Sequence, residues 1–405
     1  MPLFAKLFEK NAIKAALMCF LGFLAGLSVY AGVKNALEYS QDFQWDAAKA
    51  LSMRLDPYEL SLEEQKALEH PELEQFYRMF TDRGLKQKME ANQFPSLLML
   101  LGPMTLLAPQ TAKTVWLMLN LLFTAGIIWL LRKTFFAKAE VFDFAVMILL
   151  MIAGTPYRNQ LGVGQHTLFA FFFFMLAVYV DDKSPLKAKW ANTIITALCL
   201  FVSYFKYTLT APLAILFLYR KRYKELAISV LGHVILTEAA ALWLGKSFIY
   251  MIKAPLTVAS ALAAEGGLDL SLLLGAKGGI VAAGVVFAAL AVIAVKFPAD
   301  REYILFPVLI LWSLVITYHR TYDFFVLSVV AVLFCKAYPQ DLSEKIKKVL
   351  LYWYAALLVL VYFGLRVFGE NMPSRIAVGI VYYAFTIVLS AISIKMIKDW
   401  KRDNG

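Results

Sequence analysis

The chain has 405 residues, of which 60% are hydrophobic and 17% charged, and its mean hydropathy is +0.65. This composition excludes a soluble globular domain of that size, because too few polar side chains are present to cover its surface. The formal net charge of +11 does not indicate nucleic-acid binding, since the basic residues are spread over short segments between apolar runs. The sequence predicts an all-α polytopic membrane protein with a single domain over 1–405.

The first apolar run, 12–33, is long enough to span a hydrocarbon core of about 30 Å, and we expect it to be kept as a helix rather than cleaved as a signal peptide. Lys6, Lys10 and Lys14 accompany its beginning, so the positive-inside rule places that end in the cytoplasm. The following loop, 34–93, then lies outside. Its apolar residues recur at roughly helical spacing from 61 to 92, which predicts amphipathic helices on the outer membrane surface.

Two apolar stretches come next. The stretch 94–107 is short and contains Pro95 and Pro103, so we expect a re-entrant or surface-lying segment, whereas 111–131 has full length and crosses. With this assignment every later basic cluster returns to the cytoplasm, as do both termini. The sequence then predicts about twelve crossings, at 12–33, 111–131, 141–155, 166–180, 191–205, 208–219, 226–245, 276–296, 303–317, 323–337, 349–367 and 375–395.

Several of these crossings are too short for a whole bilayer. They border two polar turns, 156–165 and 206–208, and a cavity open to the outer leaflet would explain them, because irregular backbone is tolerated where it lines water. Misplaced helix boundaries are the alternative explanation. A second long outer loop, 247–274, either covers a bound substrate or is a flexible linker.

The outer face collects the ionisable residues that are costly to keep near a membrane. Carboxylates and cations occur together there, which suits a site for an anionic lipid headgroup or a phosphate. The acidic residues are Asp42, Asp46 and Asp56, and the cationic or polar ones are Arg158, Gln165, His166, Lys206, His319 and Arg320.

The order of several short motifs over the first 210 residues is more specific than any one of them. The sequence has an acidic residue after the first helix, an aromatic residue with two alanines, an Asp-Pro-Tyr motif, an apolar stretch with prolines, a Gly-Gln pair and a lysine at a helix break: Asp42, Trp45, Ala47, Ala48, Asp56 to Tyr58, 94–107, Gly164, Gln165 and Lys206. In this order it resembles the integral-membrane GT-C glycosyltransferases, in particular glycosyltransferase family 87, the polyprenyl-phosphate-mannose-dependent mannosyltransferases.

The chain departs from the family pattern at three places. The family has a glycine before the Asp-Pro-Tyr motif, a tyrosine with two prolines in the apolar stretch, and a proline after the lysine, where this sequence has Met53 to Leu55, Phe94 to Ser96, and Tyr207. These departures leave the predicted fold unchanged, and they bear on which sugar and which acceptor the resemblance implies.

The resemblance implies transfer of mannose, or of another hexose or pentose, from a polyprenyl-phosphate-sugar donor to a lipid-linked or glycan acceptor on the outer, periplasmic face of the inner (plasma) membrane. Asp42 would be the general base of an inverting reaction, with Asp46 and Asp56 as supporting carboxylates. Arg158, Gln165, His166, Lys206, His319 and Arg320 would bind the donor phosphate. No cofactor and no metal ion are expected, although Asp42 with Asp46 can recruit a divalent cation.

Each assignment has a plainer alternative. Asp42 can be an interfacial carboxylate that caps the next helix, Asp46 a solvated residue, and Asp56 the start of a turn. Lys206 can extend to the interface, Arg158 and Arg320 can be interfacial anchors, and His319 a neutral hydrogen-bonded residue. A transporter or flippase of a lipid-linked saccharide is the alternative from another class. Inverted repeats would favour it, and the sequence contains no convincing internal repeat.

Overall fold

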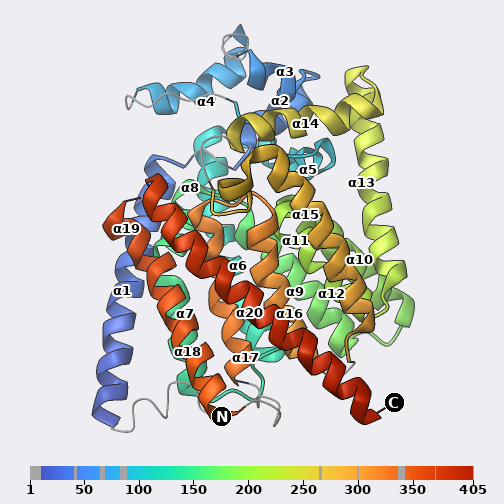
Figure 1. The fold of residues 1–405 in the computed structure, drawn as a ribbon. Helices are drawn as coiled ribbons and strands as arrows, with labels where there is room; N and C mark the ends of the chain where they lie inside the picture. The colour runs from blue at the N-terminus through green and yellow to red at the C-terminus, as the bar shows by residue number, and fades with distance from the viewer. Residues whose placement is uncertain are drawn as a thin grey trace.

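The structure, a computed structural model, describes residues 11–40, 43–63, 69–82, 89–263, 267–298, 301–335, 343–369 and 371–404. Asp42 therefore lies outside the described residues. All regular secondary structure within these ranges is helical. Figure 1 shows a bundle of long helices with a layer of short helices across one end.

Seven helices in the described ranges are long and apolar enough to cross a membrane, which makes this a multi-pass membrane protein. They are α1 (Asn11–Glu38), α6 (Pro109–Lys133), the segment Lys189–Leu213, α13 (Tyr223–Leu244), the Lys277–Lys296 part of α15 (Ser271–Lys296), the segment Lys345–Phe368 and the Met372–Lys395 part of α20 (Met372–Asn404). The pair α7 (Val141–Ala153) and α8 (Thr155–Val163) makes an eighth if it is one span, bent by 54°.

Shorter helices complete the bundle. They are α9 (Thr167–Lys183), α10 (Lys189–Ser203), η3 (Tyr204–Lys206), α11 (Tyr207–Leu213), α12 (Ile215–Tyr219), α16 (Glu302–Ile316), η4 (Thr321–Ala331), α17 (Val332–Cys335), α18 (Glu344–Val359), the π-helical turn η5 (Leu360–Gly364) and α19 (Leu365–Phe368).

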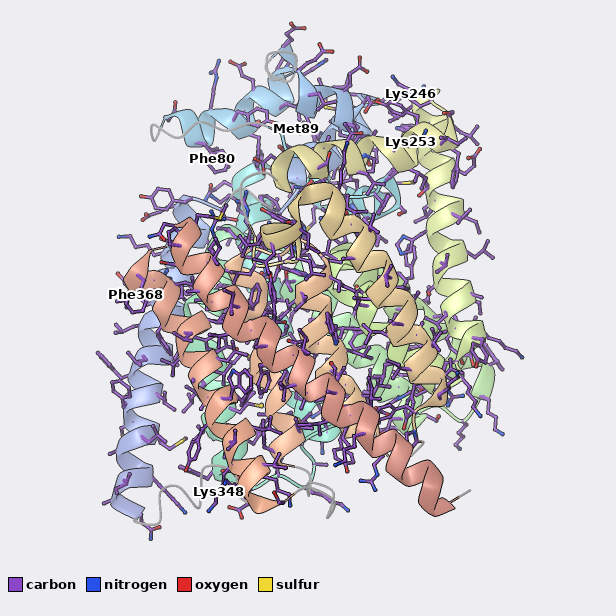
Figure 2. All side chains as sticks on the ribbon, in the orientation of Figure 1. Phe80, Met89, Lys246, Lys253, Lys348 and Phe368 are labelled. Atoms are coloured by element: carbon purple, nitrogen blue, oxygen red, sulfur yellow. The ribbon has the colours of Figure 1, made fainter. Side chains whose placement is uncertain are left out.

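The segment Lys189–Leu213 has the length and composition of one span, but ion pairs at one end of the bundle show that 189–219 is a hairpin. Arg220, just after α12, donates to Asp181 near the end of α9 at 2.9 Å and to Glu302 at the start of α16 at 2.6 Å. Since α10 begins soon after α9 ends, α10 and α11–α12 both reach this end, and the chain must reverse at η3. Lys348 lies at the same end in Figure 2, and we call it the basic end.

The opposite end is covered by a cap layer, which we define as α2 (Trp45–Ser52), α3 (Pro57–Leu62), α4 (Pro71–Thr81), α5 (Pro95–Leu100), η2 (Gly102–Leu106) and α14 (Phe248–Ala263). It has an apolar core of its own, in which Trp45 stacks on Phe76 with ring centroids 5.4 Å apart. The Trp243 indole of α13 donates to the Leu51 carbonyl at 2.9 Å, so the layer is fastened to the bundle. Met89, Lys246 and Lys253 mark it in Figure 2.

Two sequence expectations about irregular segments are wrong. The predicted polar turn 156–165 is largely helical as α8, because Pro156 lies in its first turn, where proline is tolerated, and the chain breaks at Gly154 and Gly164 instead. The loop 247–274 is not a linker, since it contains α14. The segment expected to be re-entrant, 94–107, forms α5 and η2, and neither has the length of a membrane span.

Part of the predicted crossing 323–337 is an unusually long 3₁₀-helix, η4, although such runs rarely exceed 3–4 residues. Side-chain hydroxyls from the neighbouring helices form hydrogen bonds with several of its backbone groups. The Tyr362 hydroxyl accepts from the Ser328 amide at 3.0 Å and donates to the Phe325 carbonyl at 2.8 Å, and Tyr354 donates to the Ser328 carbonyl at 3.0 Å. These bonds replace part of the ladder that an α-helix would supply.

Candidate functional site

Asp323, at the start of η4, is a fully buried carboxylate on which several donors converge. His319 Nδ1 donates to Oδ2 at 2.8 Å, and the Thr167 hydroxyl donates to Oδ1 in a very short bond. Lys206 Nζ lies 3.3 Å from Oδ2. We call these four residues, together with Gln165, the Asp323 cluster. A buried carboxylate is tolerated only when it is paired and hydrogen-bonded in this way.

Lys206 ends the 3₁₀ turn η3, where the hairpin 189–219 reverses. The turn is held by the Thr210 hydroxyl, which lies 2.8 Å from the Ser203 carbonyl and 3.1 Å from that of Lys206. Lys206 Nζ contacts Gln165 Oε1 at 3.4 Å and lies 5.3 Å from the centre of the Tyr322 ring. The contacts to Asp323 and Gln165 are longer than the 2.7–2.9 Å or so of strong charge-assisted bonds, so Nζ can still bind an anion at a shorter distance.

Gly164 breaks the chain between α8 and α9 and aims Gln165 at Lys206. Its φ of 75° lies in the left-handed region, and a Cβ there would come within 2.3 Å of Ser40 Oγ, so only glycine fits. Ser40 Oγ donates to the Val163 carbonyl at 3.0 Å, and the Trp116 indole donates to the Gly164 carbonyl at 2.7 Å. These bonds join the end of α1, α6 and the break.

His166 links the same break to the cap layer. Its Nε2 donates to the Phe43 carbonyl at 3.1 Å, and its ring stacks on Phe205 with centroids 4.4 Å apart. His166 is 1% exposed, and these two contacts make it a hydrogen-bonding anchor between the break and the cap layer. Its role in binding the donor phosphate stays a prediction.

Asp42, the predicted base, cannot be placed directly, since it lies outside the described residues. The described residues on either side of it can be placed. Ser40 is bonded to Val163 and Phe43 to His166, so both sides of the Asp42 position are attached to the α8–α9 break that carries Gln165.

The two predicted supporting carboxylates hold the cap layer together. Asp46 is 3% exposed and accepts from the Tyr77 hydroxyl of α4 at 2.9 Å, so the alternative of a solvated Asp46 is wrong. Burial and the Asp46 charge raise the pKa of Tyr77. Asp56 starts a turn, as one sequence interpretation held, and caps α3 by accepting from the Tyr58 and Glu59 amides at 3.0 and 3.2 Å.

We expect Asp56→Ala to lower the stability of the protein rather than its catalytic activity. The substitution removes the α3 cap and the 2.6 Å bond from the Tyr250 hydroxyl, and losing such a cap costs about 1–2 kcal/mol. Asp56→Asn, which can still cap, is the matched control and should lose less. Thermal unfolding of the purified protein in detergent measures both. A stable Asp56→Ala protein without activity would contradict this structural role.

The two predicted arginines each bond to a near neighbour in the sequence. Arg158 donates to Asn159 Oδ1 through Nε at 3.3 Å and Nη2 at 2.9 Å, and the charge of Arg366 acts on it. Arg320 Nε donates to the Tyr318 hydroxyl at 2.9 Å. Of the predicted phosphate-binding residues, the structure thus brings Gln165, Lys206 and His319 together, while Arg158 lies beside another arginine.

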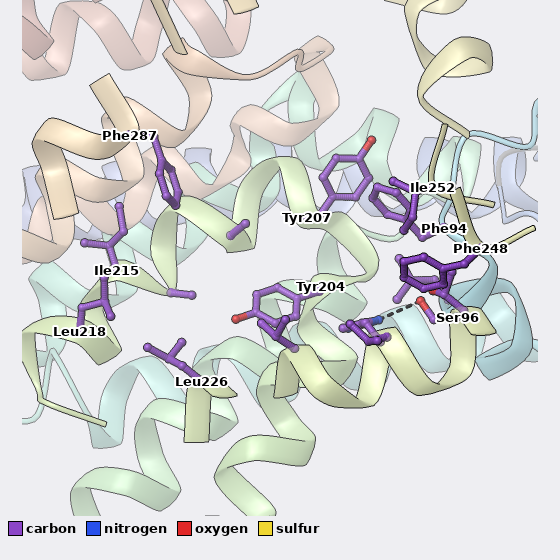
Figure 3. A pocket seen from close by; sticks show the side chains of 17 residues that line it. Phe94, Ser96, Tyr204, Tyr207, Ile215, Leu218, Leu226, Phe248, Ile252 and Phe287 are labelled. Atoms are coloured by element: carbon purple, nitrogen blue, oxygen red, sulfur yellow. Dashed lines mark hydrogen bonds between the residues drawn. The ribbon is translucent and has the colours of Figure 1, made fainter. Parts of the chain in front are cut away.

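An apolar groove of about 410 Å³ lies on the other side of η3. Tyr204 and Tyr207, three residues apart on one face of the turn, line it, while Lys206 points toward Asp323. It extends along α13 from Leu226 to Thr237 and reaches Phe248 at the start of α14 (Figure 3). We call this space the α13 groove. The only hydrogen bond drawn in it joins the Ser96 hydroxyl to His233 Nδ1, at 2.9 Å.

Two members of the cluster, Asp323 and Thr167, had no role in the sequence interpretation. Asp323 is the first residue of the predicted crossing 323–337, and the sequence assigned it no chemical role. Its position four residues after His319 was an available signal, because that spacing lets two side chains meet on one helical turn. Thr167 carries no such signal, since it meets Asp323 only through the packing of α9 against η4.

No three His, Cys, Asp or Glu side chains in the described ranges lie close enough together to hold a metal ion. Comparison of the sequence with models of known families, with curated proteins and with solved structures finds no match. The function therefore has to be inferred from the Asp323 cluster, the α13 groove and the attachment of the segment around Asp42.

Proposed function

We propose that this protein is a GT-C type glycosyltransferase similar to family 87. It would transfer a sugar from a polyprenyl-phosphate-sugar donor to a lipid-linked or glycan acceptor at the cap end of the bundle. The observation that carries the proposal is the position of η3, which presents a nearly buried lysine on one side and lines a long apolar groove on the other. A lipid phosphate with an apolar chain needs both features.

The α13 groove suits the polyprenyl chain. It runs beside α13 past Leu226, Val230 and Val234 to the cap layer, and its wall is almost wholly apolar. Burying an apolar chain along such a wall contributes roughly 25 cal/mol per Å² of surface removed from water. The sugar and the phosphate would then lie near η3, within reach of Lys206.

The chemistry needs one base and one anion site. The Asp42 carboxylate would take the proton of the acceptor hydroxyl, the hydroxyl oxygen would attack the anomeric carbon, and the bond from that carbon to the phosphate oxygen would break with inversion. Lys206 would hold the phosphate as its negative charge grows. Because the leaving group is already a phosphate, no general acid is required.

For the topology we propose twelve crossings of the plasma membrane, with both termini and the basic end in the cytoplasm. The basic loops at Lys138, Lys187 and Arg222 support this orientation. Single cysteines at these positions should react with a membrane-impermeant thiol reagent only after the inner face is exposed. Cysteines at positions 64 and 265 should react in intact cells. Labelling of position 138 from outside would contradict the assignment of 94–107 as a non-crossing segment.

Filling the groove should weaken donor use without unfolding the protein. Ala211→Trp and Ala214→Trp place an indole in the α13 groove, and we expect the KM for the lipid donor to rise about tenfold, the loss that about 1.4 kcal/mol of binding energy represents. The control is Leu122→Trp, because Leu122 of α6 is 64% exposed and lies outside the groove. The assay follows transfer of radiolabelled sugar from polyprenyl-phosphate-mannose and its glucose and pentose analogues. Movement of these lipids between leaflets without transfer would favour the flippase alternative.

A further inference from the structure

A pair of arginines lies on the side of the bundle away from the groove. Gly154, which precedes α8, packs against η5 so closely that a Cβ there would come within 2.7 Å of the Tyr362 ring. Arg158 follows Gly154 by four residues, or about one helical turn, and Arg366 follows Tyr362 by the same number. Both helices run toward the cap end, and Arg366 lies close enough to Arg158 for its charge to act on it.

Within the described ranges, no carboxylate forms an ion pair with either arginine. Among the described residues, Arg158 bonds Asn159 along one edge of its guanidinium, and no ion pair joins Arg158 or Arg366 to Asp or Glu. Arg158 is partly buried, which strengthens the repulsion between the two charges. Two guanidiniums held together in this way present several N–H donors to a common anion.

The surroundings identify the kind of anion. Val367 and Phe368, next to Arg366, are 76% and 67% exposed, and Phe368 points away from the bundle in Figure 2. In a membrane protein such side chains contact lipid chains, so the arginine pair opens sideways to the lipid near the cap end. A soluble anion would not need this apolar margin.

We propose that Arg158 and Arg366 together bind the phosphate of a membrane lipid in the leaflet at the cap end. The site is distinct from the Asp323 cluster, because Arg158 lies in the first turn of α8, whereas Gln165 follows the end of that helix. It does not depend on the proposed sugar transfer. Phosphodiester lipids and inorganic phosphate share the required chemistry, and the lipid is favoured by the exposed Val367 and Phe368.

The test measures phosphatidylglycerol and inorganic phosphate binding to the purified full-length chain in detergent. R158Q and R366Q should each weaken phosphatidylglycerol binding about tenfold or more, since each removes charge-assisted bonds to the phosphate. Inorganic phosphate should bind the unaltered chain at least tenfold more weakly than the lipid. K253Q, which removes an exposed charge from α14, is the control and should bind normally.

A second readout separates binding from a structural role. Without lipid, R366Q should melt at a higher temperature than the unaltered chain, because the repulsion is relieved, and added lipid should no longer stabilise it. Unchanged phosphatidylglycerol affinity in both R158Q and R366Q would overturn the proposal. A lowered melting temperature of lipid-free R366Q would also overturn it, and inorganic phosphate binding as tightly as phosphatidylglycerol would exclude a lipid site.

Discussion

Purified Asp42→Asn protein is expected to fold and bind the lipid donor while losing nearly all sugar transfer. The amide keeps the shape of the carboxylate but cannot take the proton of the acceptor hydroxyl, and base catalysis of this kind contributes roughly 10²- to 10⁴-fold. Donor binding should persist, because the proposed phosphate and chain contacts come from Lys206 and the α13 groove. The measurement is turnover at saturating donor together with donor affinity of the same preparation.

Asp46→Asn is the matched control for Asp42→Asn. Asp46 is buried and bonded to Tyr77, so the variant should lose some stability of the cap layer and keep measurable transfer. If Asp42→Asn turns over at a near-normal rate and Asp46→Asn is inactive, the base is Asp46. Full activity in both variants would remove the proposed mechanism.

Lys206→Met should abolish donor binding and also destabilise the protein. It leaves the fully buried Asp323 without its cation, and breaking a buried pair from one side costs about 3–5 kcal/mol. His319 and Thr167 still bond the carboxylate, so we expect the lower end of that range. Donor affinity and the melting temperature are measured on the same samples.

The double variant Lys206→Met with Asp323→Asn separates these two effects. Removing both charges together should recover much of the lost stability, because no unpaired charge remains buried. Donor affinity should stay low, since the cation for the phosphate is still missing. A double variant that binds donor normally would show that Lys206 acts only as the partner of Asp323.

The apolar runs predicted the helical, membrane-spanning class of the protein, because a run of about 20 apolar residues has few other stable structures. They did not predict α8, whose Arg158, Asn159 and Gln160 look like a polar turn. Its helix is stabilised by close packing against α1, where a Cβ added at Gly32 would come within 3.1 Å of Leu161 and 3.2 Å of the Arg158 carbonyl oxygen. Such support comes from a distant helix and leaves no local pattern.

Only some residues of the candidate site could be predicted from the sequence. Lys206 and Gln165 stand out because a polar residue within an apolar run is costly. The contact between Lys206 and Asp323 could not be predicted, since it joins residues more than 100 positions apart. The contacts of His166 with the Phe43 carbonyl and the Phe205 ring could not be predicted either, since they also join residues that are distant in the sequence.

The separate apolar core of the cap layer has a consequence for how the protein is made. Trp45, Phe76 and Phe80 belong to the first part of the chain, but Ala240, Met251 and Val258 complete the same core. During synthesis the early aromatic residues therefore lack part of this core until α13 and α14 have been made. A chain stopped before residue 240 would leave that aromatic surface exposed, and we expect it to be bound by chaperones or degraded rather than to accumulate.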